Sequence, residues 1–235
     1  MKNIYLITIL TLFISNCGEK VREEITERFD NGDKKLLVKY KGEGGDEVVV
    51  ERITYNESGD TLILENTLDK LKMEREYYEN GQISGERNYK DGEKDGKWIS
   101  YWDNGQKSNE TNYKDGKKDG KWIDYWENGQ ILWDGNYKDG EKDGKWTYYY
   151  ENGQIENEEN YKDGKRDGKW IVYHENGQME EEGHYKDDLV KGELIQYNEN
   201  GTIKSKEHFV DGKKTEYYCY YDETGQKLTE GYLKD

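Results

Sequence analysis

The tripeptide Glu-Asn-Gly, or a close variant of it, returns every 24 residues through most of this chain. Its seven copies are Glu79-Asn80-Gly81, Asp103-Asn104-Gly105, Glu127-Asn128-Gly129, Glu151-Asn152-Gly153, Glu175-Asn176-Gly177, Glu199-Asn200-Gly201 and Glu223-Thr224-Gly225. So regular a spacing indicates a repeat architecture, in which one short unit is stacked on copies of itself. Fold and function must therefore be argued from the 24-residue unit.

The chain is poor in the aliphatic residues that normally form a core. Leu, Ile, Val and Phe supply 40 of its 235 residues and the net charge is −16, a combination typical of disordered chains. However, 22 Tyr and 7 Trp recur with the repeat and supply large, half-buried side chains instead. Ala and Pro are absent and Gly is frequent, so we expect an ordered all-β chain with Gly-containing turns.

Each repeat is predicted to form one β-hairpin. Asn-Gly is the strongest sequence signal for a type I′ turn, because both central residues of that turn need a positive φ. A second connection, residues 91–96, also recurs, and we place its centre between Glu93 and Lys94, so that Tyr89 faces Trp98 across the strands. The predicted fold is an open, single-layer antiparallel meander of repeated hairpins.

Stacking of the hairpins is expected to align residues 24 positions apart into ladders. The predicted structural ladders contain Tyr89, Tyr101, Tyr113, Tyr125, Tyr137, Tyr149, Tyr161 and Tyr173. The Trp residues have two candidate uses, either packing within a thin sheet or forming a platform on which sugar rings or a partner's side chains stack. This candidate binding face contains Trp98, Trp102, Trp122, Trp126, Trp133, Trp146 and Trp170.

The first residues have the layout of an export signal. Lys2 precedes an apolar stretch, residues 4–14, that is too short to span a membrane and is soon followed by Cys17. The segment resembles the signal peptide and lipobox of bacterial lipoproteins, which implies removal of residues 1–16 and acylation of Cys17. Lipid would then anchor the chain to a bacterial membrane, at the outer membrane or the cell surface. The alternative is a buried first strand with an incidental Cys.

The rest of the chain divides by how well it keeps the period. After a short linker, residues 17–24, the region 25–74 contains degenerate turns at residues 29–32 and 55–59 and is interpreted as diverged β repeats. Residues 75–235 are predicted to form the repeat array, whose last copies lose motif residues, as expected of a degenerate C-terminal cap.

No catalytic or metal-binding pattern stands out. Carboxylates recur equally in every copy, whereas paired catalytic acids need two different environments. The three His share no ligand spacing with the two Cys. Asp-Gly pairs such as Asp91-Gly92 are interpreted as turns, with a calcium loop as the alternative. We therefore expect no enzyme activity, no metal and no cofactor, and an acidic chain is not expected to bind nucleic acid.

The pattern Tyr-x-Glu-Asn-Gly-Gln, followed by Tyr-Lys-Asp-Gly-Lys-x-Asp-Gly-Lys-Trp-x-x-Tyr, resembles the MORN repeat in its bacterial variant form. Among such proteins the chain is similar to the YwqK-type antitoxins, and the resemblance implies a binding or scaffolding role. The leading hypothesis is a monomeric, non-enzymatic lipoprotein of the cell envelope that binds an unidentified protein partner. Two alternatives stay open: an antitoxin or immunity protein that neutralises a basic toxin, and a cell-wall polysaccharide-binding protein that uses the Trp and Tyr ladders.

Overall fold

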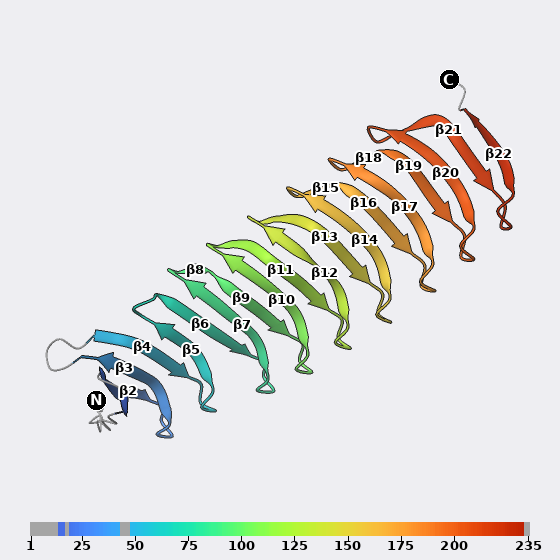
Figure 1. Ribbon diagram of the computed structural model, residues 1–235. Helices are drawn as coiled ribbons and strands as arrows, with labels where there is room; N and C mark the ends of the chain where they lie inside the picture. The colour runs from blue at the N-terminus through green and yellow to red at the C-terminus, as the bar shows by residue number, and fades with distance from the viewer. Residues whose placement is uncertain (1–13, 17–18, 43–47, 233–235) are drawn as a thin grey trace. The chain divides into compact units, whose positions relative to one another are not determined.

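The computed structural model describes residues 14–16, 19–42 and 48–232 of the chain. Within these ranges the chain forms strands and turns and contains no helix, so no helix that could cross a membrane is found there (Figure 1). The strands pair antiparallel in chain order. The predicted all-β, open antiparallel meander of hairpins is therefore confirmed.

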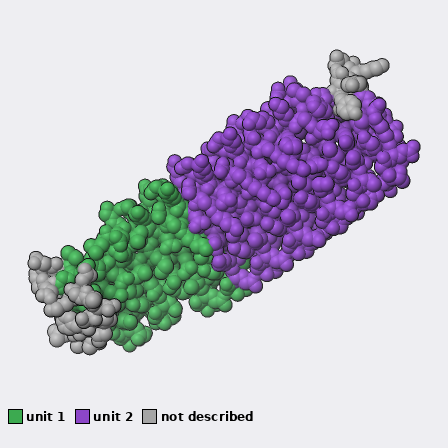
Figure 2. Space-filling model, viewed as in Figure 1, with its two compact units in different colours: residues 1–105, 113–116 green, residues 106–112, 117–235 purple. Residues whose placement is uncertain are grey.

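Two compact units divide the chain, residues 1–105 with 113–116, and residues 106–112 with 117–235 (Figure 2). The first nine strands are β1 (Ile14–Asn16), β2 (Glu19–Arg28), β3 (Lys34–Lys41), β4 (Val48–Tyr55), β5 (Thr61–Asn66), β6 (Leu71–Tyr77), β7 (Ile83–Lys90), β8 (Glu93–Lys94) and β9 (Gly96–Tyr101). The strands that follow are β10 (Lys107–Lys114), β11 (Lys117–Tyr125), β12 (Ile131–Lys138), β13 (Glu141–Tyr149), β14 (Ile155–Lys162), β15 (Lys165–Arg166), β16 (Gly168–Tyr173), β17 (Met179–Lys186), β18 (Leu189–Val190), β19 (Gly192–Tyr197), β20 (Ile203–Val210), β21 (Lys213–Tyr221) and β22 (Lys227–Tyr232).

The linker predicted at residues 17–24 is shorter than expected, because β2 already begins at Glu19. Its β-branched residues pair with β3, with Val21 opposite Lys41 and Ile25 opposite Leu37. The many charged residues around them obscured this strand in the sequence. Cys17 and residues 1–13 of the predicted signal peptide lie outside the described residues.

The Asn-Gly turns close hairpins as predicted, but they are not type I′ turns. In the turn 78–81 only Gly81 has a positive φ, 83°, and the Tyr78 N–H donates to the Gln82 carbonyl. This is a three-residue connection, in which a type I turn is followed by a left-handed Gly. The degenerate turns at residues 29–32 and 55–59 also place Gly at a positive φ.

The type I′ turn is formed by Asp91-Gly92, where φ is 52° and 85° and Lys90 pairs with Glu93. The predicted centre between Glu93 and Lys94 is therefore wrong. The turn recurs at Asp115-Gly116, Asp139-Gly140, Asp163-Gly164, Asp187-Asp188 and Asp211-Gly212.

A bulge after this turn sets the position of the Trp. Tyr89 pairs with Lys94, but further along the same hairpin Gly85 pairs with Ser100, so the register shifts between these pairs. Trp98 is consequently not directly opposite Tyr89. The two rings nevertheless touch, with centroids 5.2 Å apart in an edge-to-face arrangement, because the long indole reaches across the bulge.

Candidate binding face

On one face of the strands, Trp, Tyr and a cation form the same contact in successive repeats. Each Trp packs against the Tyr fifteen residues later, on the following hairpin. The ring centroids are 5.2 Å apart for Trp98 and Tyr113, 5.3 Å for Trp122 and Tyr137, 6.1 Å for Trp146 and Tyr161, and 5.5 Å for Trp170 and Tyr185. We call each such pair, together with its cation, an aromatic–cation cluster.

The cation comes from the residue four positions before each Trp. Lys118 Nζ lies 3.6 Å from the centroid of Trp122 and 4.7 Å from that of Tyr137. The corresponding residues are Lys94, Lys142 and Arg166. In the sequence these residues fall within the predicted connection at residues 91–96 and its copies and were not recognised as partners of the rings, although a Lys or Arg precedes every one of the four Trp at the same interval.

Trp133 is an extra ring, because the equivalent positions in the neighbouring repeats are Asn109 and Asn157. It stacks on Trp122, at 5.8 Å and 16°, and packs against Trp146 at 5.2 Å. The Trp146 side chain is 0% exposed and that of Trp170 is 9% exposed. A fully covered ring offers no face on which a sugar could stack, so these indoles serve packing.

Trp102 and Trp126 lie outside the clusters, at the start of Asn-Gly turns. At the equivalent position, Tyr150 donates its hydroxyl to the carbonyl of Tyr173 in the next repeat, at 2.7 Å. The buried indole N–H groups of Trp102 and Trp126 have no hydrogen-bond partner among the described residues. The seven Trp predicted as one binding face are thus divided between two places, five around the clusters and two at the turns.

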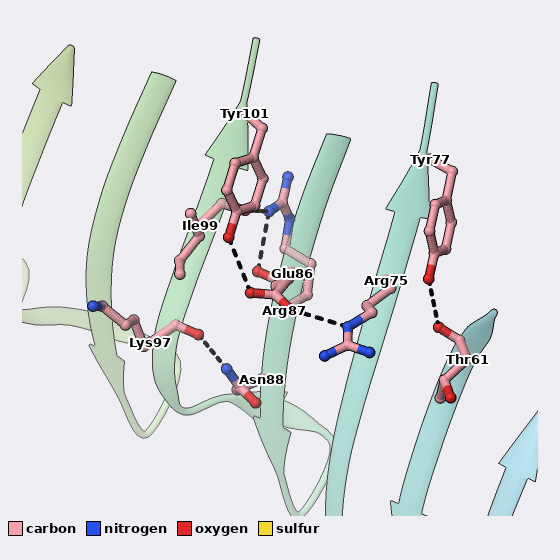
Figure 3. A network of polar contacts seen from close by, with 9 residues as sticks. All are labelled: Thr61, Arg75, Tyr77, Glu86, Arg87, Asn88, Lys97, Ile99 and Tyr101. Atoms are coloured by element: carbon pink, nitrogen blue, oxygen red, sulfur yellow. Dashed lines mark hydrogen bonds and ion pairs between the residues drawn. The ribbon is translucent and has the colours of Figure 1, made fainter. Parts of the chain in front are cut away.

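The predicted Tyr ladders are likewise divided between the two faces. Tyr89, Tyr113, Tyr137 and Tyr161 belong to the clusters, whereas Tyr101, Tyr125, Tyr149 and Tyr173 alternate with the cluster Trp and lie on the opposite face. There, the Tyr101 hydroxyl donates to Glu86 Oε2 at 3.2 Å and Arg75 Nε pairs with Glu86 Oε1 at 3.0 Å (Figure 3).

The same Tyr–carboxylate–cation network recurs further along the chain. Tyr197 donates to Glu182 at 2.6 Å, and Lys169 of the preceding hairpin pairs with the same carboxylate at 2.6 Å. Lys169 and Tyr197 together hold the pKa of Glu182 below its usual value. Burial, helped by Glu182, raises the pKa of Tyr197 to about 12. These groups stabilise one another, which indicates a structural role.

The Asn-Gly turns of the second unit display a row of exposed acidic residues, which we call the acidic edge. Beside three of the acids, the Asn side chain donates to a main-chain carbonyl of the next turn; Asn128 reaches Glu151 at 3.2 Å, Asn176 reaches Glu199 at 3.1 Å and Asn200 reaches Glu223 at 2.9 Å. Two strands separate successive turns, so neighbouring carboxylates are about 10 Å apart. The acidic edge consists of Glu127, Glu151, Glu175, Glu199 and Glu223.

No group of three or more His, Cys, Asp or Glu that could hold a metal occurs in the described part of the chain. The Asp-Gly turns, for which a calcium loop was the alternative, make hydrogen bonds to the preceding hairpin. The Gly116 N–H donates to the Lys94 carbonyl, and the Asp115 N–H donates to Asp95 Oδ2 at 3.3 Å.

Fold and repeat geometry define a β-hairpin repeat protein, and comparison with known families agrees. The model of the MORN repeat variant matches residues 73–91, 94–115, 118–139, 142–163, 166–187 and 191–211, together more than half of the chain. The chain belongs to the MORN repeat variant family, whose repeats generally serve as protein- or membrane-binding modules.

No curated protein matches the chain. A solved structure described as "Crystal Structure of TcdB2-TccC3-Cdc42" is similar at 13% identity, over 87% of this chain and 13% of that one, with a TM-score of 0.32. The chain thus spans only a small part of that protein, and a likeness at this TM-score supports no conclusion.

Proposed function

We propose that the chain is a non-enzymatic module that binds a basic protein partner at the bacterial cell envelope. The observation that supports this most directly is the use of the aromatic rings. Because Trp146 and Trp170 are buried in the clusters, the surface left for recognition is mainly charged. The glycan-binding alternative needs open ring faces and is correspondingly weakened.

The acidic edge is the proposed contact surface. Its carboxylates are exposed, the Asn128, Asn176 and Asn200 side chains tie their turns to the next, and the whole chain carries a net charge of −16. Such a field attracts a positively charged partner and raises its rate of association, an effect that decreases with salt.

Capture of a partner from envelope extracts tests this proposal. The tagged chain is compared with a variant of the acidic edge that carries Glu127→Gln, Glu151→Gln and Glu175→Gln. A control with the same net charge carries Glu93→Gln, Glu141→Gln and Asp163→Asn, three exposed acids at the other set of turns. We expect a protein that is captured by the native chain and the control, and lost with the acidic-edge variant or at high salt. Equal capture by all three chains would contradict the proposal.

Attachment to the envelope is proposed to occur through lipid on Cys17, on the strength of the signal-like sequence before it. The test is incorporation of labelled palmitate together with membrane fractionation. Native protein should be labelled and sediment with membranes, whereas Cys17→Ser should lose the label and leave the membrane fraction. Unlabelled native protein would argue against the anchor.

Neutralisation of a basic toxin is a second candidate, favoured by the strong negative charge. Co-expression with basic toxin candidates encoded beside this gene tests it. Rescue of growth that depends on the acidic edge would support the antitoxin role, and absence of rescue with each neighbour would dispose of it.

A further inference from the structure

The series of aromatic–cation clusters is interrupted between β6 and β7. In the regular repeat, Trp122 faces Gly135 on the next strand. By the same register Glu74 faces Arg87, and the neighbouring ring on that strand is Tyr89. A carboxylate therefore stands where the regular repeat places an indole.

This exchange leaves a cleft of about 500 Å³ beside the Tyr89 ring. Trp98 packs against Tyr89 from the following strand at 5.2 Å, and Lys72 Nζ lies 5.6 Å from the ring centroid. No indole of the described residues occupies the place that Trp98 takes beside Tyr113. The cleft is lined, among others, by Glu65, Asn66, Thr67, Lys72, Glu74 and Tyr89.

Glu65 is the carboxylate of this cleft that lacks a counter-ion. Lys72 pairs with Glu74, and Lys70 pairs with Asp91 at 3.1 Å. Glu65 is half-buried and has no ion pair or hydrogen bond with any described side chain, although Arg52 and Lys72 lie across from it on the two adjacent strands. Lys72 stands between Glu65 and Tyr89 in the register, and its ammonium is the group that lies over the Tyr89 ring where the regular repeat has an indole. A half-buried carboxylate near an aromatic ring that no indole covers is a favourable site for a planar cation, which would take the place of that ammonium over the ring.

We propose that this cleft binds an arginine side chain presented by the partner protein. The guanidinium stacks on Tyr89, in the place of the missing indole, and donates two parallel N–H groups to Glu65. An aromatic side chain would fill the space but leave Glu65 uncompensated, and a lysine would pair with Glu65 but has no flat surface to stack. The inference builds on the proposed protein-binding function and specifies the partner's chemistry.

Acetylated and amidated tripeptides Ala-Arg-Ala, Ala-Lys-Ala and Ala-Trp-Ala are the probes, titrated into the full chain and followed by amide chemical shifts. We expect the arginine peptide to shift resonances of β5, β6 and β7 and to bind more tightly than the other two. Glu65→Gln should weaken it about tenfold or more, because a charge-assisted hydrogen bond is lost. Glu79→Gln, at an exposed turn, should leave binding unchanged.

A second variant, Glu74→Trp, restores the indole and fills the cleft. It should abolish binding of the arginine peptide. Its melting temperature should be higher than that of the native chain, and this increase would show that the variant is folded. Each of three outcomes would overturn the inference. The tryptophan peptide could bind more tightly than the arginine peptide, the arginine peptide could bind Glu65→Gln as tightly as the native chain, or the arginine peptide could cause no chemical-shift change at millimolar concentration. None of these results would change the outcome expected for partner capture by the acidic edge. The two proposals can therefore fail separately.

Discussion

Gly135 lies against the indole of Trp146 so closely that a Cβ at position 135 would be 2.2 Å from the ring atom Cδ2. The same ring is 0% exposed, and Trp133 and Tyr137 pack against it at 5.2 Å and 5.1 Å. The absence of a side chain at position 135 therefore allows the most deeply buried ring of the second unit to lie on the strand.

Gly135→Ala is expected to destabilise the protein by about 1–3 kcal/mol, because the backbone or the packed indole must shift to admit the methyl group. Urea denaturation followed by Trp fluorescence measures the change. Thr111→Ala is the matched control, since it places Ala at the equivalent position of the preceding repeat without adding a Cβ. If Gly135→Ala lowered the free energy of unfolding no more than the control does, the indole of Trp146 would have room to move.

Lys142→Met should cost about 1–2 kcal/mol, because the cation over Trp146 and Tyr161 and its hydrogen bond to Tyr148 are lost while the apolar stem remains. Chemical denaturation provides the measurement. Lys138→Met, at the exposed last residue of β12, should change stability by less than about 0.5 kcal/mol. Equal effects of the two substitutions would rule out a contribution of the ring contacts.

Asn128→Ala should lower the unfolding free energy by about 1 kcal/mol, because the Asn side chain accepts the Gln130 N–H and donates to the Glu151 carbonyl. Asn128→Asp should cost at least as much, since it keeps the acceptor but turns a carboxylate toward that carbonyl. Glu151→Ala retains the main-chain carbonyl and serves as the control. If Asn128→Asp matched the native stability, the bond to the next repeat would be unimportant.

Stability at alkaline pH should depend on Tyr197, whose pKa is raised to about 12 by burial and by Glu182. The folded chain holds this proton more tightly than the unfolded chain, in which the pKa of Tyr is about 10. The resulting stabilisation is complete below the unfolded pKa and is lost as the pH rises through the folded one. In unfolding measurements across this range, Tyr197→Phe should lose stability less steeply than the native chain. Identical slopes would contradict the prediction.

At acidic pH the sign is opposite for Glu182, because Lys169 and Tyr197 hold its pKa below the usual value. Its stabilisation is present above the unfolded pKa and is lost as the pH falls through the lowered folded pKa. Glu182→Gln should therefore be less stable than the native chain at neutral pH and should lose less stability on acidification. A constant difference between the two chains at every pH would exclude this contribution.

The period of 24 residues was sufficient to predict strands, hairpins and their order, because identical units can only stack in one repeated way. The exact pairing was not predictable from turn preferences. Asn-Gly favours a type I′ turn when considered alone. Asn80 nevertheless lies in a type I turn, in which its side chain bonds to Gln82 and to the next repeat. Neighbouring hairpins thus override the local preference.

The cleft beside Tyr89 was only partly visible in the sequence. Glu74 stands 24 residues before Trp98, so the period alone aligns these two positions. That the exchange opens a cleft depends on the pairing of β6 with β7, which places Glu74 and Tyr89 on the same face of the strands. By contrast, the Lys or Arg four residues before each cluster Trp was visible in the sequence. Only its contact with the ring was not predictable, because that contact depends on the bulge.

Because the Asn amides, as at Asn128 and Asn176, and the Asp-Gly turns bond to the adjacent hairpin, the same bonds would form at the new junction if one whole copy were deleted or duplicated. An in-frame genetic change of 72 nucleotides, three for each residue of the period, could therefore lengthen or shorten the protein by one increment without demanding a new core. The number of regularly spaced surface carboxylates would change in step, so that the length of the acidic edge could evolve by whole repeats.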